Sequence, residues 1–357
     1  MSQRVTTRLA ESPIVSLLFL FTLLFSSPTN ETRGQDQVFF HAGKGGVQTG
    51  EILSVSSRKI ELKTKKETLG IEVLDIKKVV FDYEPASLTK GREALQKGRF
   101  EQAAQHLTSL DLNDFNNRQI RQEILFYTAF AKSELSQSVG GNRTEALNLL
   151  QQFLTDQTDS WHYYHAAELA GQLALSSGQE DKAQNYFTLF AQSPWPEYQL
   201  RGAVYQTEAF LAQENYEAAL NKITEIKESP LSTEAARTQK LFAQVNEAIC
   251  LAETGKLPQA IQQLEELHET VAPSDHLLLA KIHNALGHAY QRHGNTEAAL
   301  LAYLHVDLIS FQDPQEHAQA LYFLSKLWPK LDHSERGLTA KETLKNRYPG
   351  SSWALRK

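Results

Sequence analysis

The sequence predicts an α+β protein: a small N-terminal β-barrel-like module, followed by an all-α, right-handed solenoid of about seven helix pairs. Two observations lead to this fold class. Residues 38–82 contain short segments in which apolar and polar residues alternate, as they do in β-strands. From residue 84 onward, a small residue recurs every 36 to 43 residues, which is a suitable length for one pair of antiparallel helices.

The N-terminus predicts export. Arg4 and Arg8 precede an apolar run at 14–25, and Ser26 and Ser27 follow it. This order describes a secretory signal peptide over residues 1–27, with a linker at 28–37. The run is short for a membrane-spanning helix, but an uncleaved anchor, and so membrane association through this segment, is the alternative. In both cases we expect an exported protein of the periplasm or cell envelope.

The region 38–82 predicts about five short strands, at 38–40, 50–55, 59–63, 69–73 and 78–81. A sheet this small is stable as a closed barrel or when it packs on a neighbour. We expect it to be separable from the helices. The glycines in 43–46 predict a hairpin turn. A phosphate-binding loop would need Gly-x4-Gly-Lys-Ser/Thr at the start of a helix, and that pattern is absent here.

The helical region 84–357 has a regular anchor residue after each polar break. The separations between anchors are 43, 37, 36, 41 and 39 residues, and the anchors are Ala103, Ala146, Ala183, Ala219, Ala260 and Ala299. A seventh unit fits if Gly337 takes the same place. Five residues before each anchor, a residue is expected to end a helix, and it is usually glycine: Gly98, Gly141, Gly178, Glu214, Gly255 and Gly294.

Two further positions repeat with the anchors. Twelve residues before most anchors stands another small residue: Gly91, Gly171, Thr207, Ala248 and Gly287. Four residues after each anchor stands a large apolar one: Leu107, Leu150, Phe187, Ile223, Leu264 and Tyr303. The small residues predict that two helices cross closely. The second unit departs from the pattern, with Glu134 at the small position and a lengthened turn up to Gly141.

This pattern resembles the tetratricopeptide repeat, in which Leu-Gly-x-x-Tyr is followed by Ala-x-x-x-Phe. The sixth unit matches it with Leu286, Gly287, Tyr290, Ala299 and Tyr303. The resemblance covers about 270 residues. It implies a stack of helix pairs with a concave groove that binds a protein or peptide. The strand pair "GEILSVSSRKIELKT" loosely resembles Sm-like and SH3-type barrels, and the closing "YPGSSWA" resembles repeats of bacterial envelope proteins.

The resemblance also implies which residues face the groove, since the family forms its inner face from the first helix of each unit. Carried onto this sequence, the candidate binding residues are His165, Glu168, Arg201, Glu208, Lys281, Asn284, His288 and Arg292. The side chains of the sixth unit are polar and partly basic, and could hold a carboxylate or backbone amides. The alternative is that all of them are simply solvated.

Chemistry at a dedicated site is not expected. The sequence has no nucleophile–base pair, so we predict no catalytic residue, no cofactor and no enzyme activity. Twelve histidines, including His162 and His165 one turn apart, lack a carboxylate or cysteine at ligand spacing, so no metal is predicted. The single cysteine, Cys250, lies in an apolar run and is expected in the core. A formal charge of −6 without a basic cluster argues against nucleic acid.

The sequence therefore favours an exported, non-enzymatic scaffold that binds another protein through the groove. Two alternatives remain open at this stage. The β module could bind a ligand or glycan as an accessory module, or the array could associate with copies of itself.

Overall fold

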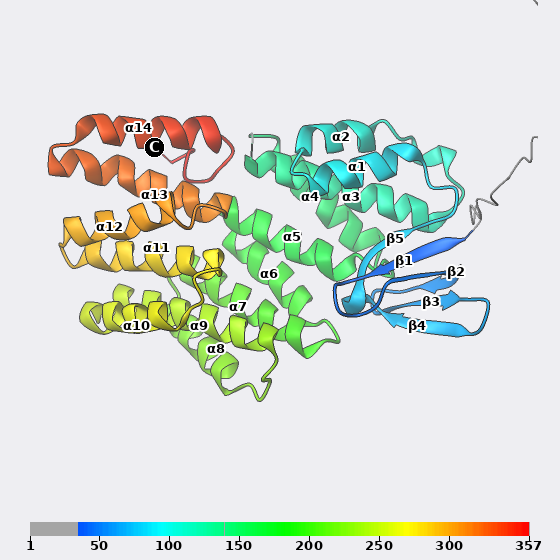
Figure 1. Ribbon diagram of the computed structural model, residues 1–357, viewed down its shortest axis with the longest axis horizontal. Coiled ribbons are helices and arrows are strands. Elements are labelled where there is room, and N and C mark those ends of the chain that lie inside the picture. The colour runs from blue at the N-terminus through cyan, green and yellow to red at the C-terminus, as the bar shows by residue number, and fades with distance from the viewer. Residues whose placement is uncertain (1–34, 139, 357) are drawn as a thin grey trace, which may run out of the picture. The chain divides into compact units, whose positions relative to one another are not determined.

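The computed structural model describes residues 35–138 and 140–356 (Figure 1). The strands are β1 (Asp36–Phe40), β2 (Val47–Val55), β3 (Lys59–Lys63), β4 (Thr68–Glu72) and β5 (Ile76–Val80). The α-helices are α1 (Ala86–Gln96), α2 (Phe100–Thr108), α3 (Arg118–Ser138), α4 (Arg143–Asp156), α5 (Tyr163–Ser176), α6 (Glu180–Ala191), α7 (Pro196–Ala212), α8 (Tyr216–Glu228), α9 (Glu234–Glu253), α10 (Leu257–Thr270), α11 (His276–Arg292), α12 (Thr296–Leu308), α13 (Pro314–Leu327) and α14 (Ser334–Arg347).

These elements confirm the predicted fold class, with five strands followed by seven helix pairs in the described part of the chain. The predicted signal segment, residues 1–27, lies outside the described residues. Within the described residues, no helix combines the length and the apolar character that crossing a bilayer requires.

The five strands form one antiparallel sheet in the order β4-β3-β2-β1-β5. The alternation in the sequence sets its two faces: in β3, Ile60 and Leu62 are fully buried, whereas Lys59 and Lys63 are exposed. The glycines of residues 43–46 lie in the hairpin turn between β1 and β2, as predicted, and Gly43 has a positive φ of 83° there.

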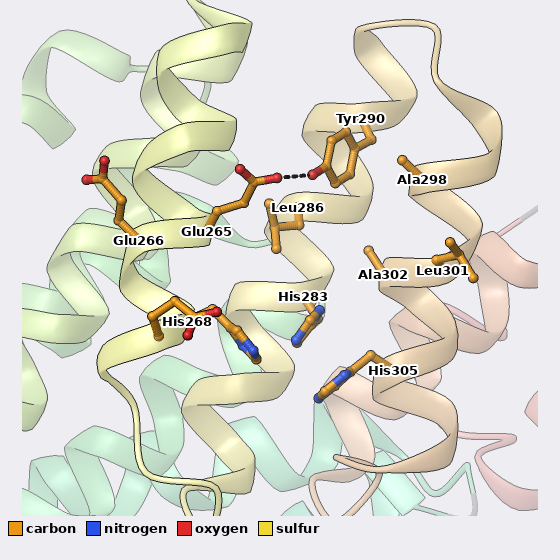
Figure 2. A pocket seen from close by; sticks show the side chains of 11 residues that line it. Glu265, Glu266, His268, His283, Leu286, Tyr290, Ala298, Leu301, Ala302 and His305 are labelled. Atoms are coloured by element: carbon orange, nitrogen blue, oxygen red, sulfur yellow. Dashed lines mark hydrogen bonds between the residues drawn. The ribbon is translucent and has the colours of Figure 1, made fainter.

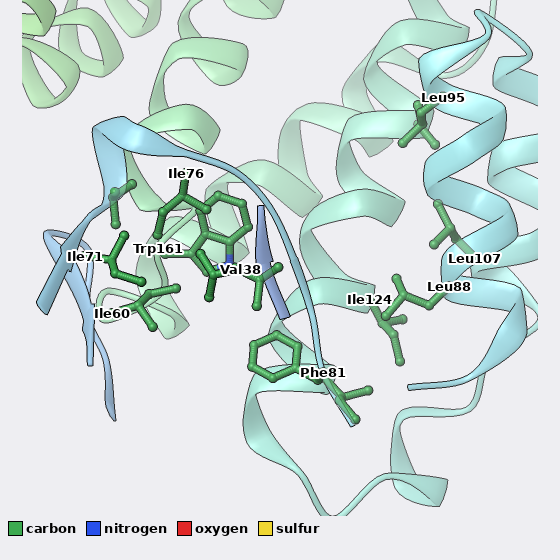
Figure 3. Packing of buried hydrophobic residues seen from close by; sticks show 14 of the residues in the cluster. Val38, Ile60, Ile71, Ile76, Phe81, Leu88, Leu95, Leu107, Ile124 and Trp161 are labelled. Atoms are coloured by element: carbon green, nitrogen blue, oxygen red, sulfur yellow. The ribbon is translucent and has the colours of Figure 1, made fainter. Parts of the chain in front are cut away.

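The sheet is open, which corrects the expected barrel-like closure, because its edge strands β4 and β5 do not pair with each other. Its inner face is filled by the indole of Trp161, from the connection between α4 and α5. This ring lies among Val38, Ile60, Ile71 and Ile76 (Figure 3). A tryptophan side chain buries about 150–250 Å². Packing on a neighbour therefore stabilises the small sheet without closure.

The sheet and the first helices share one hydrophobic core. The cluster that contains Val38 and Phe81 continues into the helices through Leu88, Leu107 and Ile124 (Figure 3). Residues Gln35–Lys357 accordingly form one compact unit. The two expected domains, 38–82 and 84–357, thus share a core, and the expectation that the sheet can be separated from the helices stays a prediction.

A buried ionic network also joins the sheet to the helices. The guanidinium of Arg92 donates to a carbonyl oxygen of β5 and pairs with Glu84 at 2.9 Å and Glu123 at 3.2 Å. Glu123 accepts a hydrogen bond from Trp161 Nε1 at 2.7 Å and lies 2.9 Å from His162 Nε2. Burial would raise the pKa of Glu123, but His162 and Arg92 hold it below its usual value. The carboxylate is therefore charged inside the protein.

Small residues let the two helices of each pair cross closely, as predicted. The six alanine anchors are all fully buried. In three units, a Cβ atom added to the glycine would overlap the large residue of the partner helix, at 2.6, 2.3 and 2.6 Å respectively for Gly91–Leu107, Gly171–Phe187 and Gly287–Tyr303. The repeat pattern is thus a packing pattern, in which a large side chain fills the space that the glycine leaves.

A left-handed residue connects the two helices in each of the seven pairs. Positive φ values occur at Gly98, Gly140, Gly178, Glu214, Gly255, Gly294 and Asp332. Asp332 stands five residues before Gly337, which confirms the seventh unit. In the second unit, the left-handed residue is Gly140 instead of the expected Gly141, and the fully buried small residue is Ser133 instead of Glu134. Both positions shift by one because this turn is one residue longer.

The C-terminal segment returns to the second unit of the array. The carbonyl oxygen of Gly350 accepts a hydrogen bond from Arg143 at the start of α4. A Cβ atom on Gly350 would lie 2.6 Å from the backbone nitrogen of Gly140, so no side chain fits there. Gln315, at the start of α13, donates to Gln137 near the end of α3 at 3.3 Å. The array therefore bends until its last pair meets its second (Figure 1).

Candidate functional site

The first helices of the pairs form a continuous face, because each contacts the next from α1 to α13. The structure places the eight candidate groove residues on three of these helices. His165 and Glu168 lie on α5, Arg201 and Glu208 on α7, and the others on α11: Lys281, Asn284, His288 and Arg292.

Ion pairs connect these residues across the units. Arg201 lies 2.9 Å from Glu168 of the preceding unit, and Tyr205 donates to the same carboxylate at 2.8 Å. Burial raises the pKa of Glu168, although Arg201 opposes this shift. The carboxylate and the guanidinium thus satisfy each other before any ligand arrives.

Lys281 is the centre of a second group. Its Nζ atom lies 3.1 Å from Glu208 on α7 and 3.2 Å from Glu316 on α13. Asn284 donates to the same Glu316 at 2.8 Å. Burial would lower the pKa of Lys281, but the two carboxylates raise it above its usual value. One ammonium group therefore ties three units together.

His288 and Arg292 share a partner in the fifth unit. Both contact the carboxylate of Glu253 on α9, with Arg292 Nη1 at 2.6 Å. Of the eight residues, His165 has no such partner: its side chain is exposed, beside the rings of Phe126 and Phe130 at 5.1 and 5.5 Å. The face is thus a ladder of internal ion pairs, and a ligand that binds there has to exchange them.

The histidine pair considered in the sequence is separated by the fold. His162 is buried against Glu123 and stacks on Phe126 with ring centroids 3.8 Å apart, whereas His165 is exposed. Across residues 35–138 and 140–356, no group of three or more His, Cys, Asp or Glu side chains is arranged to hold a metal ion. Cys250 is fully buried, as expected, and burial raises the pKa of its thiol to about 11.

A second candidate surface lies between α10 and α12, with α11 as its floor (Figure 2). This recess has a volume of about 630 Å³. Leu286 on the floor and Ala302 on the α12 side are apolar and almost fully buried, while Leu301 at the rim is 66% exposed. Glu265 accepts a hydrogen bond from Tyr290 across the recess (Figure 2). An exposed leucine at the edge of an apolar recess is typical of a binding surface.

Three histidines from three helices gather at one end of the recess. The rings of His283 and His305 stack with centroids 3.6 Å apart, and the centroid of His268 lies 4.9 Å from that of His283 (Figure 2). Desolvation, together with the neighbouring imidazoles, lowers the pKa of His283 to about 3. The ring nitrogens that have no hydrogen-bond partner are His268 Nδ1, His283 Nδ1, His283 Nε2 and His305 Nε2.

This recess was not predicted from the sequence. A signal was present in the spacing: His283, Leu286 and Tyr290 follow an i, i+3, i+7 pattern on one helix, and Ala298, Ala302 and His305 follow a similar stripe on the next. Each stripe alone is the pattern of a core-facing helix surface. These stripes line an open recess only because α10 and α12 lie apart in the folded protein.

Comparison with known proteins supports the fold. No protein-family description matches the sequence, and no curated protein is significantly similar to it. A tetratricopeptide repeat protein from Parabacteroides merdae ATCC 43184 aligns with a TM-score of 0.51 and 16% identity, over 73% of this chain and 91% of that chain. At this identity, the similarity shows a tetratricopeptide-like fold and nothing further.

Two other solved structures are similar at lower TM-scores. A Rap protein complexed with competence and sporulation factor gives 0.49 with 12% identity, over 75% of this chain and 76% of that chain. NprR in complex with its cognate peptide NprX gives 0.46 with 14% identity, over 73% and 77% of the two chains.

Proposed function

We propose that this protein is an exported, non-enzymatic scaffold that binds a segment of a partner protein through its tetratricopeptide-like array. The fold supports this proposal, because stacked helix pairs present extended surfaces built from many side chains. The recess between α10 and α12 carries it. It is open, has an apolar floor and exposes Leu301 to water, which costs free energy unless a partner covers the side chain.

The recess is a better docking place than the face of the first helices. On that face, the polar groups of Arg201, Lys281 and Arg292 are already held by carboxylates of neighbouring units. A partner there would replace existing ion pairs, and such an exchange gives little net free energy. In the recess, a partner would instead cover apolar surface. The groove prediction made from the sequence stays a prediction.

Site-specific photo-crosslinking tests the proposal. The photoreactive residue p-benzoylphenylalanine replaces Leu301 in the recess or, as a matched control, Leu338 on α14, which is 60% exposed. Each variant is irradiated in envelope extract. We expect a discrete adduct with a polypeptide from the Leu301 position and none from the Leu338 position. The same adducts from both positions, or no adduct from Leu301, would argue against a scaffold that docks its partner here.

Export is a separate part of the proposal and has its own test. It is supported by Arg4, Arg8 and the apolar run at 14–25, whose order is that of a signal peptide. Cell fractionation should recover the protein outside the cytoplasm, and mass spectrometry should find a mature N-terminus between residues 27 and 35. An intact, soluble chain in the cytoplasm would contradict it. An intact chain in the membrane fraction would indicate the uncleaved anchor.

A further inference from the structure

The recess between α10 and α12 has an uneven distribution of charge. Three carboxylates stand along its α10 side, from Glu265, Glu266 and Glu269, and all three side chains are exposed. None of the eleven described residues that line the recess is lysine or arginine. The carboxylates therefore lack a cation within the recess, unlike those on the face of the first helices.

The histidine group lies at one end of the same recess. A neutral imidazole has one donor and one acceptor nitrogen. His283 has no partner at either nitrogen, and His268 and His305 each have one nitrogen without a partner. These nitrogens are buried within the histidine group, so the polar groups of the recess that a ligand can reach are the exposed carboxylates on the α10 side. Cationic side chains supply only donors, so they match these carboxylates.

The apolar surface of the recess indicates which other kind of side chain the ligand contains. Leu286 and Ala302 are almost fully buried, and Leu301 extends the apolar surface outward. A volume of about 630 Å³ lies within the range of recesses that hold several side chains. An aliphatic side chain would cover this surface, with a cation placed at the α10 side.

We propose that the recess binds a peptide segment in which an aliphatic residue stands beside lysine or arginine. This inference rests on the proposed scaffold function and names the chemistry of its partner. A second copy of this chain is a poorer occupant, because it would bring a formal charge of −6 toward an acidic rim. The cationic segment pairs with the exposed carboxylates of the α10 side.

Peptide selection tests the inference without assuming the identity of the partner. A phage-displayed library of random peptides is selected on the immobilised full-length protein, and enriched peptides are synthesised. Their Kd values are then measured by fluorescence anisotropy. The recess variants are Glu266→Lys/Glu269→Lys and Leu301→Ser. The matched controls on α14 are Glu335→Lys/Glu342→Lys, which changes the net charge equally, and Leu338→Ser. All of these positions are exposed, so the variants should fold.

We expect the enriched peptides to pair an aliphatic residue with lysine or arginine. The charge reversal in the recess should weaken their Kd about tenfold or more, and Leu301→Ser about fivefold, while the controls stay within about twofold. The inference is overturned if no peptide is enriched, if the enriched peptides lack basic residues, or if they bind the recess variants as tightly as the wild type. A crosslink at Leu301 combined with any of these outcomes would leave the scaffold function standing and remove only the cationic partner.

Discussion

Gly287 and Tyr303 offer the sharpest test of how the array is packed. A Cβ atom on Gly287 would lie 2.6, 2.7 and 2.8 Å from three atoms of the Tyr303 ring, where ordinary contacts begin near 3.4 Å. Substitution Gly287→Ala therefore requires a shift of about 0.8 Å, the difference between 3.4 and 2.6 Å. The ring has little room to move, because it is fully buried and stacks on Phe323 with centroids 4.8 Å apart.

The expected magnitude combines two opposing effects. Overpacking a rigid site costs about 1–3 kcal/mol. Alanine gains about 1 kcal/mol over glycine in a helix interior. Gly287→Ala alone should therefore destabilise the protein by about 0–2 kcal/mol. In a double-mutant cycle with Tyr303→Leu, the helix-propensity gain cancels and only the clash remains, so we expect a coupling energy of about 1–2 kcal/mol. The double mutant has a natural counterpart in the fifth unit, where Ala248 and Leu264 stand at the positions of Gly287 and Tyr303 and belong to one core cluster.

The four proteins of the cycle are compared by urea unfolding, followed by far-UV circular dichroism. Hydrogen exchange of α11 and α12 accompanies it, because repeat arrays can unfold unit by unit. Tyr303→Leu should cost less in the Gly287→Ala background than in the wild type. If the two changes instead add to within about 0.5 kcal/mol, glycine and tyrosine are not packed against each other, and the reasoning from the repeat pattern fails.

Three other changes test separate features. Glu214→Gly should stabilise the protein by about 0.5–1 kcal/mol in urea unfolding, because Glu214 has a positive φ of 57° that favours glycine. A loss of stability would show that contacts of the Glu214 side chain contribute more than the relief of backbone strain. Glu123→Leu should lower the free energy of unfolding by about 3–5 kcal/mol, since it leaves buried Arg92 with one carboxylate fewer. Arg118→Ala, at an exposed ion pair, should lower it by less than about 1 kcal/mol. Equal losses would refute the assignment of Glu123 to a buried ionic network. The pKa of His283 is lowered from 6.5 to about 3, so the unfolded chain binds the proton first and the free energy of unfolding should fall as pH drops below about 6.5. His283→Gln should reduce that slope, by at most about 1.4 kcal/mol per pH unit, in urea titrations at several pH values; an unchanged slope would contradict it.

Contacts between neighbouring helices could be predicted from the sequence, because they follow from a fixed spacing. Gly287 lies 16 residues before Tyr303, and Gly171 lies 16 before Phe187, so one helix hairpin brings each pair together. The five strands were also predictable from alternation. Local periodicity carries this information because a helix pair or a hairpin forms from one continuous segment.

Contacts that depend on the curvature of the array could not be predicted. Lys281 of α11 contacts Glu208 of α7, which lies two units earlier, and the spacing along the chain does not predict this contact. The candidate groove residues lie on first helices of the pairs, but their ion-pair partners were not predicted from the sequence, and their role in binding stays a prediction. Trp161 stands in a connection with no periodic pattern, so nothing in the sequence indicated that it fills the sheet. The recess required the separation of α10 and α12, which spacing along the chain does not encode.

Hydrogen exchange of the full-length protein, with and without a selected peptide, tests most directly whether the array is a scaffold that binds its partner in the recess. We predict that amides of α10, α11 and α12 near Glu265, Leu286 and Ala302 become protected when the peptide is bound, and that the sheet over residues 36–80 does not change. Protection confined to the sheet or to α5 and α7, or no protection at saturating peptide, would contradict the proposed binding surface.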